Sequence, residues 1–278
     1  MSRFRFKERS VLPGFGLSLG VTLTYLSILV LLPLSGLFWK AGSGGWSAFL
    51  RAAFAPQAMA SYKVTFGCAF LAAFINLFAG LLVAWVLVRY KFPGKSLIDA
   101  LVDMPFALPT AVGGIALATV YGPNGFIGSR LAERGINVIQ TPIGIVIALI
   151  FISLPFVVRT VQPVLQELDG ALEEAASSLG AGRFATFRRV IFPYLVPALI
   201  TGFALAFARA IGEYGSVIFI TSNIPFKTQI APQLIYSRLD EYDYAGATSI
   251  AVVMLVFSFL MLLCVNGLQF WSQKRTRG

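Results

Sequence analysis

Long apolar stretches separated by short polar segments make up most of the chain. The first stretch runs from Val11 to Trp39 without a charged residue. A helix needs about 20 apolar residues to cross a bilayer, so each stretch of this kind predicts one transmembrane helix. The five further stretches cover residues 64–88, 104–129, 135–158, 190–226 and 244–273. Because the apolar residues are continuous rather than alternating, a transmembrane β-barrel is excluded, and the pattern predicts an all-α membrane protein with six transmembrane helices.

The first apolar stretch has two interpretations, a signal peptide or a membrane anchor. Four basic residues precede it within the first nine positions, as they do in a secretory signal. The apolar part of a signal peptide is only roughly 7–15 residues long, and this stretch is much longer. We therefore predict a retained first transmembrane helix.

The composition supports a large lipid-facing surface. Hydrophobic residues make up 57% of the 278 positions and charged residues only 12%, whereas a soluble domain is usually about 25% charged. The net charge of +10 would suggest nucleic-acid binding in a soluble protein. Here the basic residues lie between apolar stretches, where they set the orientation in the membrane. We therefore expect the lipid membrane as a partner and no nucleic acid.

The residue types that are missing exclude several kinds of site. The chain contains no histidine, which excludes histidine-based catalytic triads and His-Glu-x-x-His zinc sites. Its two cysteines, Cys68 and Cys264, lie inside apolar stretches and are interpreted as small apolar side chains. We predict no catalytic residue and no metal site.

One short segment resembles part of a nucleotide-binding loop. Gly94, Lys95 and Ser96 match the last three letters of a P-loop. That loop also needs a glycine five residues earlier, where this chain has Arg89, and a preceding strand, where this chain has a predicted membrane helix. We therefore predict that the chain binds no cofactor and is not an enzyme, so that any energy for transport comes from another subunit.

The distribution of basic residues predicts the orientation. Six crossings place both termini on the same side of the membrane. If that side is the cytoplasm, the inner segments carry about twice as many Lys and Arg residues as the outer loops. Positive charges concentrate on the cytoplasmic side, which favours cytoplasmic N and C termini.

The longest inner segment, residues 159–190, is too polar to cross the membrane. Its middle part, Leu165 to Ala181, has the spacing of an amphipathic helix, and Pro193 marks the start of the next transmembrane helix. Small residues beside Glu174 would let the backbone of another protein approach closely. Two interpretations stay open, a connector helix on the membrane surface and a docking helix for a partner.

The same segment resembles the EAA motif of ATP-binding cassette importer permeases. The motif consists of Glu-Ala-Ala, three residues, Gly, nine residues and an Ile-x-Leu-Pro-like end. The matching positions are Glu174, Ala175, Ala176, Gly180 and Pro193. Val190 and Phe192 replace the usual Ile and Leu. The resemblance implies a permease core with a cytoplasmic coupling helix, in which these five residues dock in a cleft of an ATPase subunit.

Other segments resemble the permeases of oxyanion importers. These segments are residues 88–95, 106–114, 121–125 and 208–215. With them, the chain is similar to the T-type permease subunits of bacterial sulfate/thiosulfate importers. Molybdate permeases share several of these signatures, so molybdate or another oxyanion is an alternative substrate.

The resemblance also implies a domain division and a set of partners. Residues 1–59 would hold the first transmembrane helix, residues 60–265 the permease core with five transmembrane helices and a coupling loop at 160–190, and residues 266–278 a basic cytoplasmic tail. The implied partners are two cytoplasmic ATPase subunits that use the ATP, a second, related permease subunit that completes a heterodimer, and an extracytoplasmic sulfate/thiosulfate-binding protein. The implied location is the cytoplasmic (inner) membrane of a bacterium.

Arg209 and Glu213 are two charges within one apolar stretch. Each alone near the bilayer centre would cost about 2.5–3.5 kcal/mol. A continuous helix would place both on one face, where they can pair, because they are four positions apart. The pair is either a structural contact with a neighbouring helix or part of the translocation path or its gate. Intramembrane charges usually mark a pathway, which favours the second interpretation.

A competing hypothesis from another class is an ion-coupled secondary transporter. Such transporters usually show internal repeats and several intramembrane acids. This chain shows no clear repeat and a single acid within an apolar stretch, which favours the ATP-driven importer.

Overall fold

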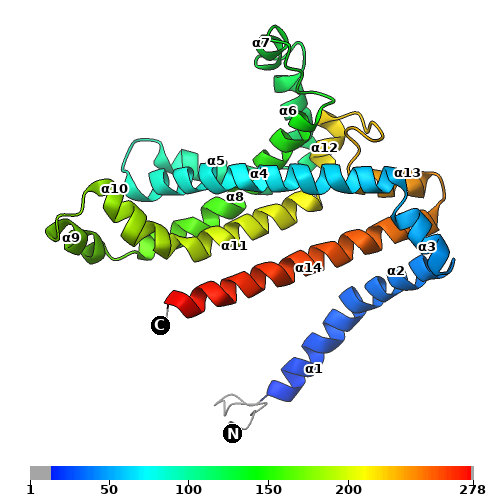
Figure 1. Ribbon diagram of the computed structural model, residues 1–278, viewed down its shortest axis with the longest axis horizontal. Helices are drawn as coiled ribbons and strands as arrows, with labels where there is room; N and C mark the ends of the chain where they lie inside the picture. Colours follow the sequence, from blue (N-terminus) through cyan, green and yellow to red (C-terminus); the bar gives the residue numbers. More distant parts are fainter. Residues whose placement is uncertain (1–13, 277–278) are drawn as a thin grey trace.

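The structure is a computed structural model that describes residues 14–276, and every regular element in this range is helical (Figure 1). In chain order the elements are α1 (Phe15–Leu26), the π-helical turn η1 (Ser27–Leu31), α2 (Leu32–Gly42), α3 (Trp46–Ala53), α4 (Pro56–Arg89), α5 (Lys95–Ala107), α6 (Thr110–Tyr121), α7 (Gly128–Ala132), α8 (Pro142–Glu167), α9 (Gly170–Ser178), α10 (Arg183–Thr186), the π-helical turn η2 (Phe187–Ile191), α11 (Phe192–Ile211), α12 (Gly215–Ile220), α13 (Ala231–Asp240) and α14 (Tyr244–Thr276). The predicted all-α fold class is confirmed.

The transmembrane segments match the predicted number only if one bent pair is counted. Five described helical segments are long and apolar enough to cross a membrane, namely residues 15–42, 56–89, 142–167, 183–211 and 244–265. The sixth predicted helix, 104–129, is instead the pair α5 and α6, bent by 114°. Leu108 at the bend has extended backbone angles, because Pro109 disfavours a helical conformation in the residue before it. The predicted crossing is therefore a broken helix pair rather than one uninterrupted helix.

Two further predicted helices are divided. The apolar stretch 190–226 forms α11, which ends at Ile211, and the separate helix α12. The inner amphipathic helix predicted for residues 165–181 is interrupted at Leu168, whose backbone is extended. The Asp169 carboxylate then starts the new helix α9 by accepting a hydrogen bond from its first turn, as an N-cap side chain does. The first part of the predicted inner helix therefore belongs to the end of α8.

The core of the bundle is the contact between α4, α8 and α11. Val157 of α8 lies between two glycines: a Cβ atom at Gly80 of α4 would lie 2.7 Å from its Cβ, and one at Gly202 of α11 would lie 3.0 Å from its Cα. Small residues let helix backbones approach closely in a membrane. Asn76 adds a polar link between α4 and α8, because its Nδ2 donates to Ser153 Oγ at 2.9 Å. These three helices form a close-packed unit that carries the candidate sites.

The first transmembrane segment, formed by α1, η1 and α2, diverges from this unit (Figure 1). None of its most apolar 18-residue window is buried within the chain, compared with 56% of the corresponding window of α8. Its C-terminal part, α2, packs against α14. The start of α1 and the end of α14 lie toward the same end of the molecule as α9 (Figure 1). Most of this first segment is therefore open to lipid or to another subunit.

Candidate functional site

The two ends of α9 are capped by the chain itself. At its start the Asp169 carboxylate accepts a hydrogen bond from the Ala171 backbone N–H at 2.9 Å. At its end the Ala181 N–H donates to the Ala176 carbonyl oxygen at 3.0 Å, a bond typical of a helix that ends in a left-handed residue. That residue is Gly180, with φ of +80°. The backbone conformation therefore explains why the EAA-like motif has a glycine at this position.

The predicted docking residues lie on the free surface of α9. Glu174 and Ala175 are exposed and Ala176 is half-buried. Leu172 is 48% exposed and Leu179 is 89% exposed. The Glu174 carboxylate has no ion pair with any residue between 14 and 276. Exposed apolar side chains beside such a carboxylate suit a contact with another protein better than a solvated connector. Docking by these residues stays a prediction.

The preceding glutamate has a different environment. Glu173 forms an ion pair with Arg89 at the end of α4. The Arg89 guanidinium also lies 5.3 Å from the centre of the Trp85 ring. This contact was not predicted from the sequence, although a basic residue in the last turn of a transmembrane helix was a visible signal. Glu173 therefore fixes α9 to α4, whereas the neighbouring Glu174 faces outward.

The chain after α9 leads directly into the membrane. The elements α10, η2 and α11 form one continuous span of 29 residues, Arg183–Ile211. Pro193 is exposed at the start of α11, where a proline is tolerated because early backbone N–H groups lack helical partners. The Phe187 ring packs edge-on against Trp85 at 5.6 Å between ring centres. Only the turn at residues 179–182 separates α9 from this span.

Arg209 and Glu213 pair at the other end of α11. The Arg209 Nη1 donates to Glu213 Oε2 at 2.6 Å. The pair spans the end of the helix, because α11 stops at Ile211; the expectation of one continuous helix was wrong, while the pairing itself is present. Glu213 is 2% exposed, whereas the Arg209 side chain is 31% exposed. Only the arginine therefore reaches a surface of the chain.

The second oxygen of Glu213 holds the start of α12. Glu213 Oε1 accepts hydrogen bonds from the Ser216 backbone N–H at 2.9 Å and from Ser216 Oγ at 3.0 Å. The carboxylate thus accepts three hydrogen bonds, as a buried charge requires. This arrangement gives Glu213 a structural role at the break between α11 and α12. Whether the pair also lines the translocation path stays a prediction.

Two of the segments that resemble oxyanion permeases meet where α6 crosses α12. A Cβ atom at Gly114 of α6 would lie 2.5 Å from the Ser216 carbonyl oxygen, and one at Gly215 of α12 would lie 2.2 Å from Thr110 Oγ1. Both glycines are therefore required by the close approach of the two helices. Ser216, which contacts α6 at this crossing, also donates hydrogen bonds to the Glu213 carboxylate. The crossing therefore links the bent pair α5–α6 to Glu213.

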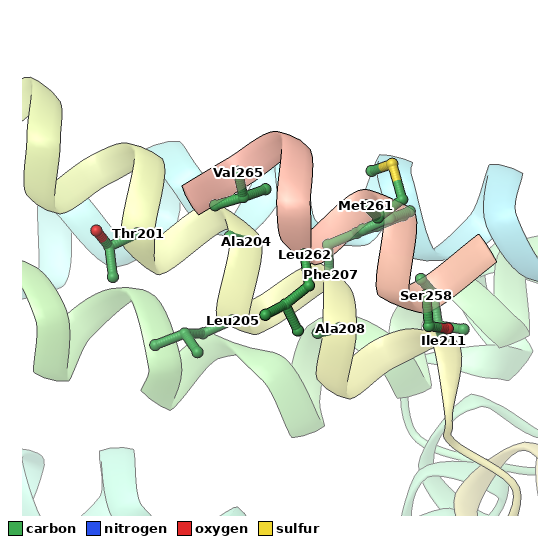
Figure 2. A pocket seen from close by; sticks show the side chains of 10 residues that line it. All are labelled: Thr201, Ala204, Leu205, Phe207, Ala208, Ile211, Ser258, Met261, Leu262 and Val265. Carbon is green, nitrogen blue, oxygen red and sulfur yellow. The ribbon is translucent and has the colours of Figure 1, made fainter. Parts of the chain in front are cut away.

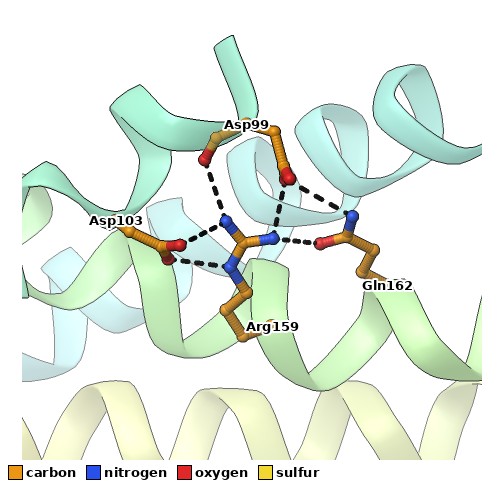
Figure 3. A network of polar contacts seen from close by, with 4 residues as sticks. All are labelled: Asp99, Asp103, Arg159 and Gln162. Carbon is orange, nitrogen blue, oxygen red and sulfur yellow. Dashed lines mark hydrogen bonds and ion pairs between the residues drawn. The ribbon is translucent and has the colours of Figure 1, made fainter. Parts of the chain in front are cut away.

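An ion-pair network that the sequence analysis missed joins α5 to α8 (Figure 3). Arg159 donates from Nε and Nη2 to the two Asp103 carboxylate oxygens, at 2.8 and 2.6 Å. Its Nη1 donates to Asp99 Oδ1 at 2.7 Å and to Gln162 Oε1 at 2.6 Å. Asp99 and Asp103 share one face of α5 because they are four residues apart, which was the available sequence signal. Charge-assisted bidentate pairs of this kind are specific as well as strong.

A small cavity lies between α14 and α11, the helix that carries Arg209 (Figure 2). Its volume is about 120 Å³. The lining is apolar except for the hydroxyls of Thr201 and Ser258, and the Thr201 hydroxyl donates to the Pro197 carbonyl oxygen within its own helix. None of the described residues that line this cavity is charged, so it offers no side-chain cation to an anion.

The candidate sites described above all lie within the part of the chain that matches one known protein family. A family model described as "Binding-protein-dependent transport system inner membrane component" matches residues 76–278. The matched residues include α9, α11, α12 and the α6 crossing. The chain belongs to this family. As a binding-protein-dependent transport component with several apolar helices, it is a multi-pass membrane protein.

Individual members of this transport family are similar over nearly the whole chain. The "Sulfate transport system permease protein CysT" of Salmonella typhimurium is 50% identical, covering 98% of this chain and 98% of that protein. The protein of the same name from Escherichia coli is 49% identical, with 99% of each chain covered. A "Probable sulfate transport system permease protein cysT" from Nephroselmis olivacea is 52% identical over 91% of this chain and 89% of its own length.

Solved structures of ABC transporters share the fold of this family member. A bacterial ABC transporter involved in the import of the acidic polysaccharide alginate has a TM-score of 0.76 at 18% identity, covering 91% of this chain and 94% of that chain. The MetNI methionine ABC transporter has a TM-score of 0.59 at 17% identity, covering 76% of this chain and 94% of that chain. At these identities the likeness concerns the fold alone.

Proposed function

We propose that this chain is the membrane-spanning permease subunit of an ATP-driven importer of sulfate and thiosulfate. The family supports binding-protein-dependent transport, and relatives at 49% and 50% identity over nearly the whole chain carry sulfate permease names. In this proposal the chain binds no ATP itself and receives the work of a separate ATPase.

The exposed face of α9 is the observation that carries the proposal. Glu174 and Ala175 are free to touch a partner, while Glu173 anchors the same helix to α4 through Arg89. A helix fixed on one side and open on the other suits the transfer of movement from a soluble subunit. Its continuation into the span that carries Arg209 gives that movement a route into the membrane.

The position of α9 at one end of the bundle determines where we place the partner subunits. Two ATPase subunits bind at the α9 end, which lies in the cytoplasm together with both termini. A second, related permease subunit completes the path, and a binding protein delivers sulfate or thiosulfate at the opposite end. Arg209 would attract a divalent anion, and its pairing with Glu213 at 2.6 Å would weaken that attraction, because a conduit must also release its substrate.

Co-purification from native membranes tests the docking surface. We expect Glu174→Lys to reduce the amount of nucleotide-binding subunit that is recovered with the tagged chain. Glu133→Lys is the matched control, because Glu133 is also an exposed glutamate and lies between α7 and α8 rather than on α9. Equal recovery with both variants, or sulfate uptake by the purified chain alone in liposomes, would overturn the proposal.

Uptake measurements test the substrate. In a bacterium that lacks its own sulfate permease, co-expression with the partner subunits should restore uptake of labelled sulfate and growth on sulfate as the sulfur source. Thiosulfate should compete with the labelled sulfate. Restored uptake of molybdate without sulfate would assign the transporter to another oxyanion.

A further inference from the structure

An apolar groove runs between α4, α11 and α14 on the half of the bundle that leads to α9. Its volume is about 530 Å³, within the roughly 300–1,000 Å³ of small-molecule pockets. The lining includes Phe70, Phe74 and Phe78 of α4, Phe192 and Phe203 of α11, and Cys264 of α14. All of these side chains are apolar or weakly polar, so the groove suits a hydrocarbon chain.

The phenylalanine rings hold one another in place along the groove. Phe70 packs edge-on against Phe203 at 5.6 Å, and Phe74 packs edge-on against Phe78 at 5.1 Å between ring centres. These rings remain open on the groove side, because Phe70, Phe74 and Phe78 are 53%, 45% and 60% exposed. The chain therefore builds an ordered apolar surface that it does not cover itself.

Two arginines, Arg188 and Arg189, lie near the end of the groove that is closer to α9. The groove face of α11 includes Phe192, Val196 and Ile200, which follow one another at intervals of four residues. Arg188 does not line the groove itself but lies in the preceding π-helical turn η2, four residues before Phe192. Four residues are close to one turn of either helix type, so Arg188 lies on the same side of the helix as Phe192. Arg188 and its neighbour Arg189 are exposed, and neither has an ion pair among residues 14–276.

The length of the groove corresponds to one leaflet. From Phe192 to Phe203 the helix rises about 16 Å at 1.5 Å per residue, about half of the roughly 30 Å hydrocarbon core. A transmembrane helix of another subunit would need a groove along the whole core. An acyl chain from a single leaflet needs only this half.

We propose that this groove binds an acyl chain of an anionic phospholipid from the cytoplasmic leaflet, and that Arg188 and Arg189 bind its phosphate head group. The assignment of the leaflet rests on the proposed function, which places α9 in the cytoplasm. A zwitterionic lipid fills the apolar part equally well, so the two unpaired arginines give the preference for a net negative head group.

The natural thiol of Cys264 provides the test. Cys264 is exposed in the groove and the only other cysteine, Cys68, is buried. The assembled transporter is placed in nanodiscs of phosphatidylcholine alone or of phosphatidylcholine with increasing phosphatidylglycerol of the same acyl chains. A neutral, apolar maleimide is added, and the rate of Cys264 modification is followed by peptide mass spectrometry.

We expect phosphatidylglycerol to slow the modification of Cys264 in the wild type. Arg188→Gln/Arg189→Gln should require about 30-fold more phosphatidylglycerol for the same protection, because each arginine near an anionic head group contributes about a fivefold effect. Arg51→Gln/Arg134→Gln is the matched control; it removes the same charge from exposed arginines remote from the groove and should leave the protection unchanged.

Three results would overturn the proposal. They are absent protection in the wild type, equal protection in the Arg188→Gln/Arg189→Gln variant, and an unreactive Cys264 in phosphatidylcholine alone, which would show that another polypeptide covers the groove. Sulfate uptake and recovery of the ATPase subunit, measured on the same preparations, report separately on the proposed function. Normal values of both with absent lipid protection would reject the lipid site alone.

Discussion

Substitution of Gly180 distinguishes between two physical reasons for the glycine of the EAA-like motif. Gly180 has φ of +80°, and a Cβ atom built there would meet nothing within 4 Å. The cost of a side chain within this subunit is therefore conformational and not steric. A left-handed backbone costs an L-residue about 1–2 kcal/mol, and Asn tolerates it better than Ala. We expect Gly180→Ala to weaken the cap of α9 by about 1 kcal/mol, roughly a fivefold shift toward a frayed end, and Gly180→Asn to weaken it less.

The alternative reason is close approach by a partner. If the ATPase backbone lies against Gly180, side-chain volume decides, and Ala is tolerated better than Asn. The two explanations therefore predict opposite orders. Recovery of the nucleotide-binding subunit over a salt series, together with sulfate uptake, measures the order. Gly182→Ala is the control, because Gly182 has φ of −70° and open space around it, so its recovery should equal that of the wild type.

The order of the two Gly180 variants decides the matter. Higher recovery and uptake for Gly180→Asn than for Gly180→Ala would support the backbone explanation. Equal or lower values for Gly180→Asn would refute it and would place the partner's backbone against the glycine. A large loss in Gly182→Ala would show that the whole loop is sensitive to any side chain.

Three further substitutions test contacts inside the bundle. Gly80→Ala places a Cβ atom 2.7 Å from both Cβ and Cγ1 of Val157, so it should destabilise the protein by about 1–3 kcal/mol. Val157→Ala in the same chain removes Cγ1 but keeps Cβ, so it should recover only part of the loss in thermal denaturation. Arg159→Gln leaves its two carboxylate partners on α5 facing each other, and we expect a loss of about 1 kcal/mol because these groups are partly exposed, with partial recovery when the partners are changed to Asn. Glu213→Gln leaves Arg209 without its counter-charge and should lower the free energy of unfolding by about 2–3 kcal/mol. The double variant Arg209→Gln/Glu213→Gln should restore the stability without restoring sulfate uptake. Recovered uptake in the double variant would show that the pair is purely structural.

The transmembrane architecture could be predicted because the lipid environment leaves few options. A bilayer requires long apolar helices, and the five helices of that kind appear directly as apolar stretches. The bend at Leu108 was not predicted, because the length of an apolar stretch does not reveal a local backbone preference within it. Pro109, which causes the bend, was visible in the sequence, and a proline at this position restricts the residue before it.

The candidate sites were predictable only where they are local in sequence. The EAA-like motif was found because its residues lie within one segment, and the Arg209–Glu213 pair because four residues separate its members. The pairs Arg89–Glu173 and Arg159–Asp99 join residues that are 84 and 60 positions apart. Such pairs follow from the packing of α4, α5 and α8, which a single sequence does not give.

The position of α11 explains how one helix connects the two candidate sites. Its N-terminal end is continuous with α10 and η2. Its C-terminal end is followed by Glu213, whose carboxylate accepts a hydrogen bond from Ser216 of α12, the helix that crosses α6. Between these ends, Gly202 packs against Val157 of α8, so this part of α11 is held against the core. A push on α9 is therefore expected to move α11 as a rigid body rather than to deform it locally. Arg209 lies near the far end of the same helix, and its side chain is 31% exposed. Under the proposed function, a small displacement at α9 would therefore change the position of this charge.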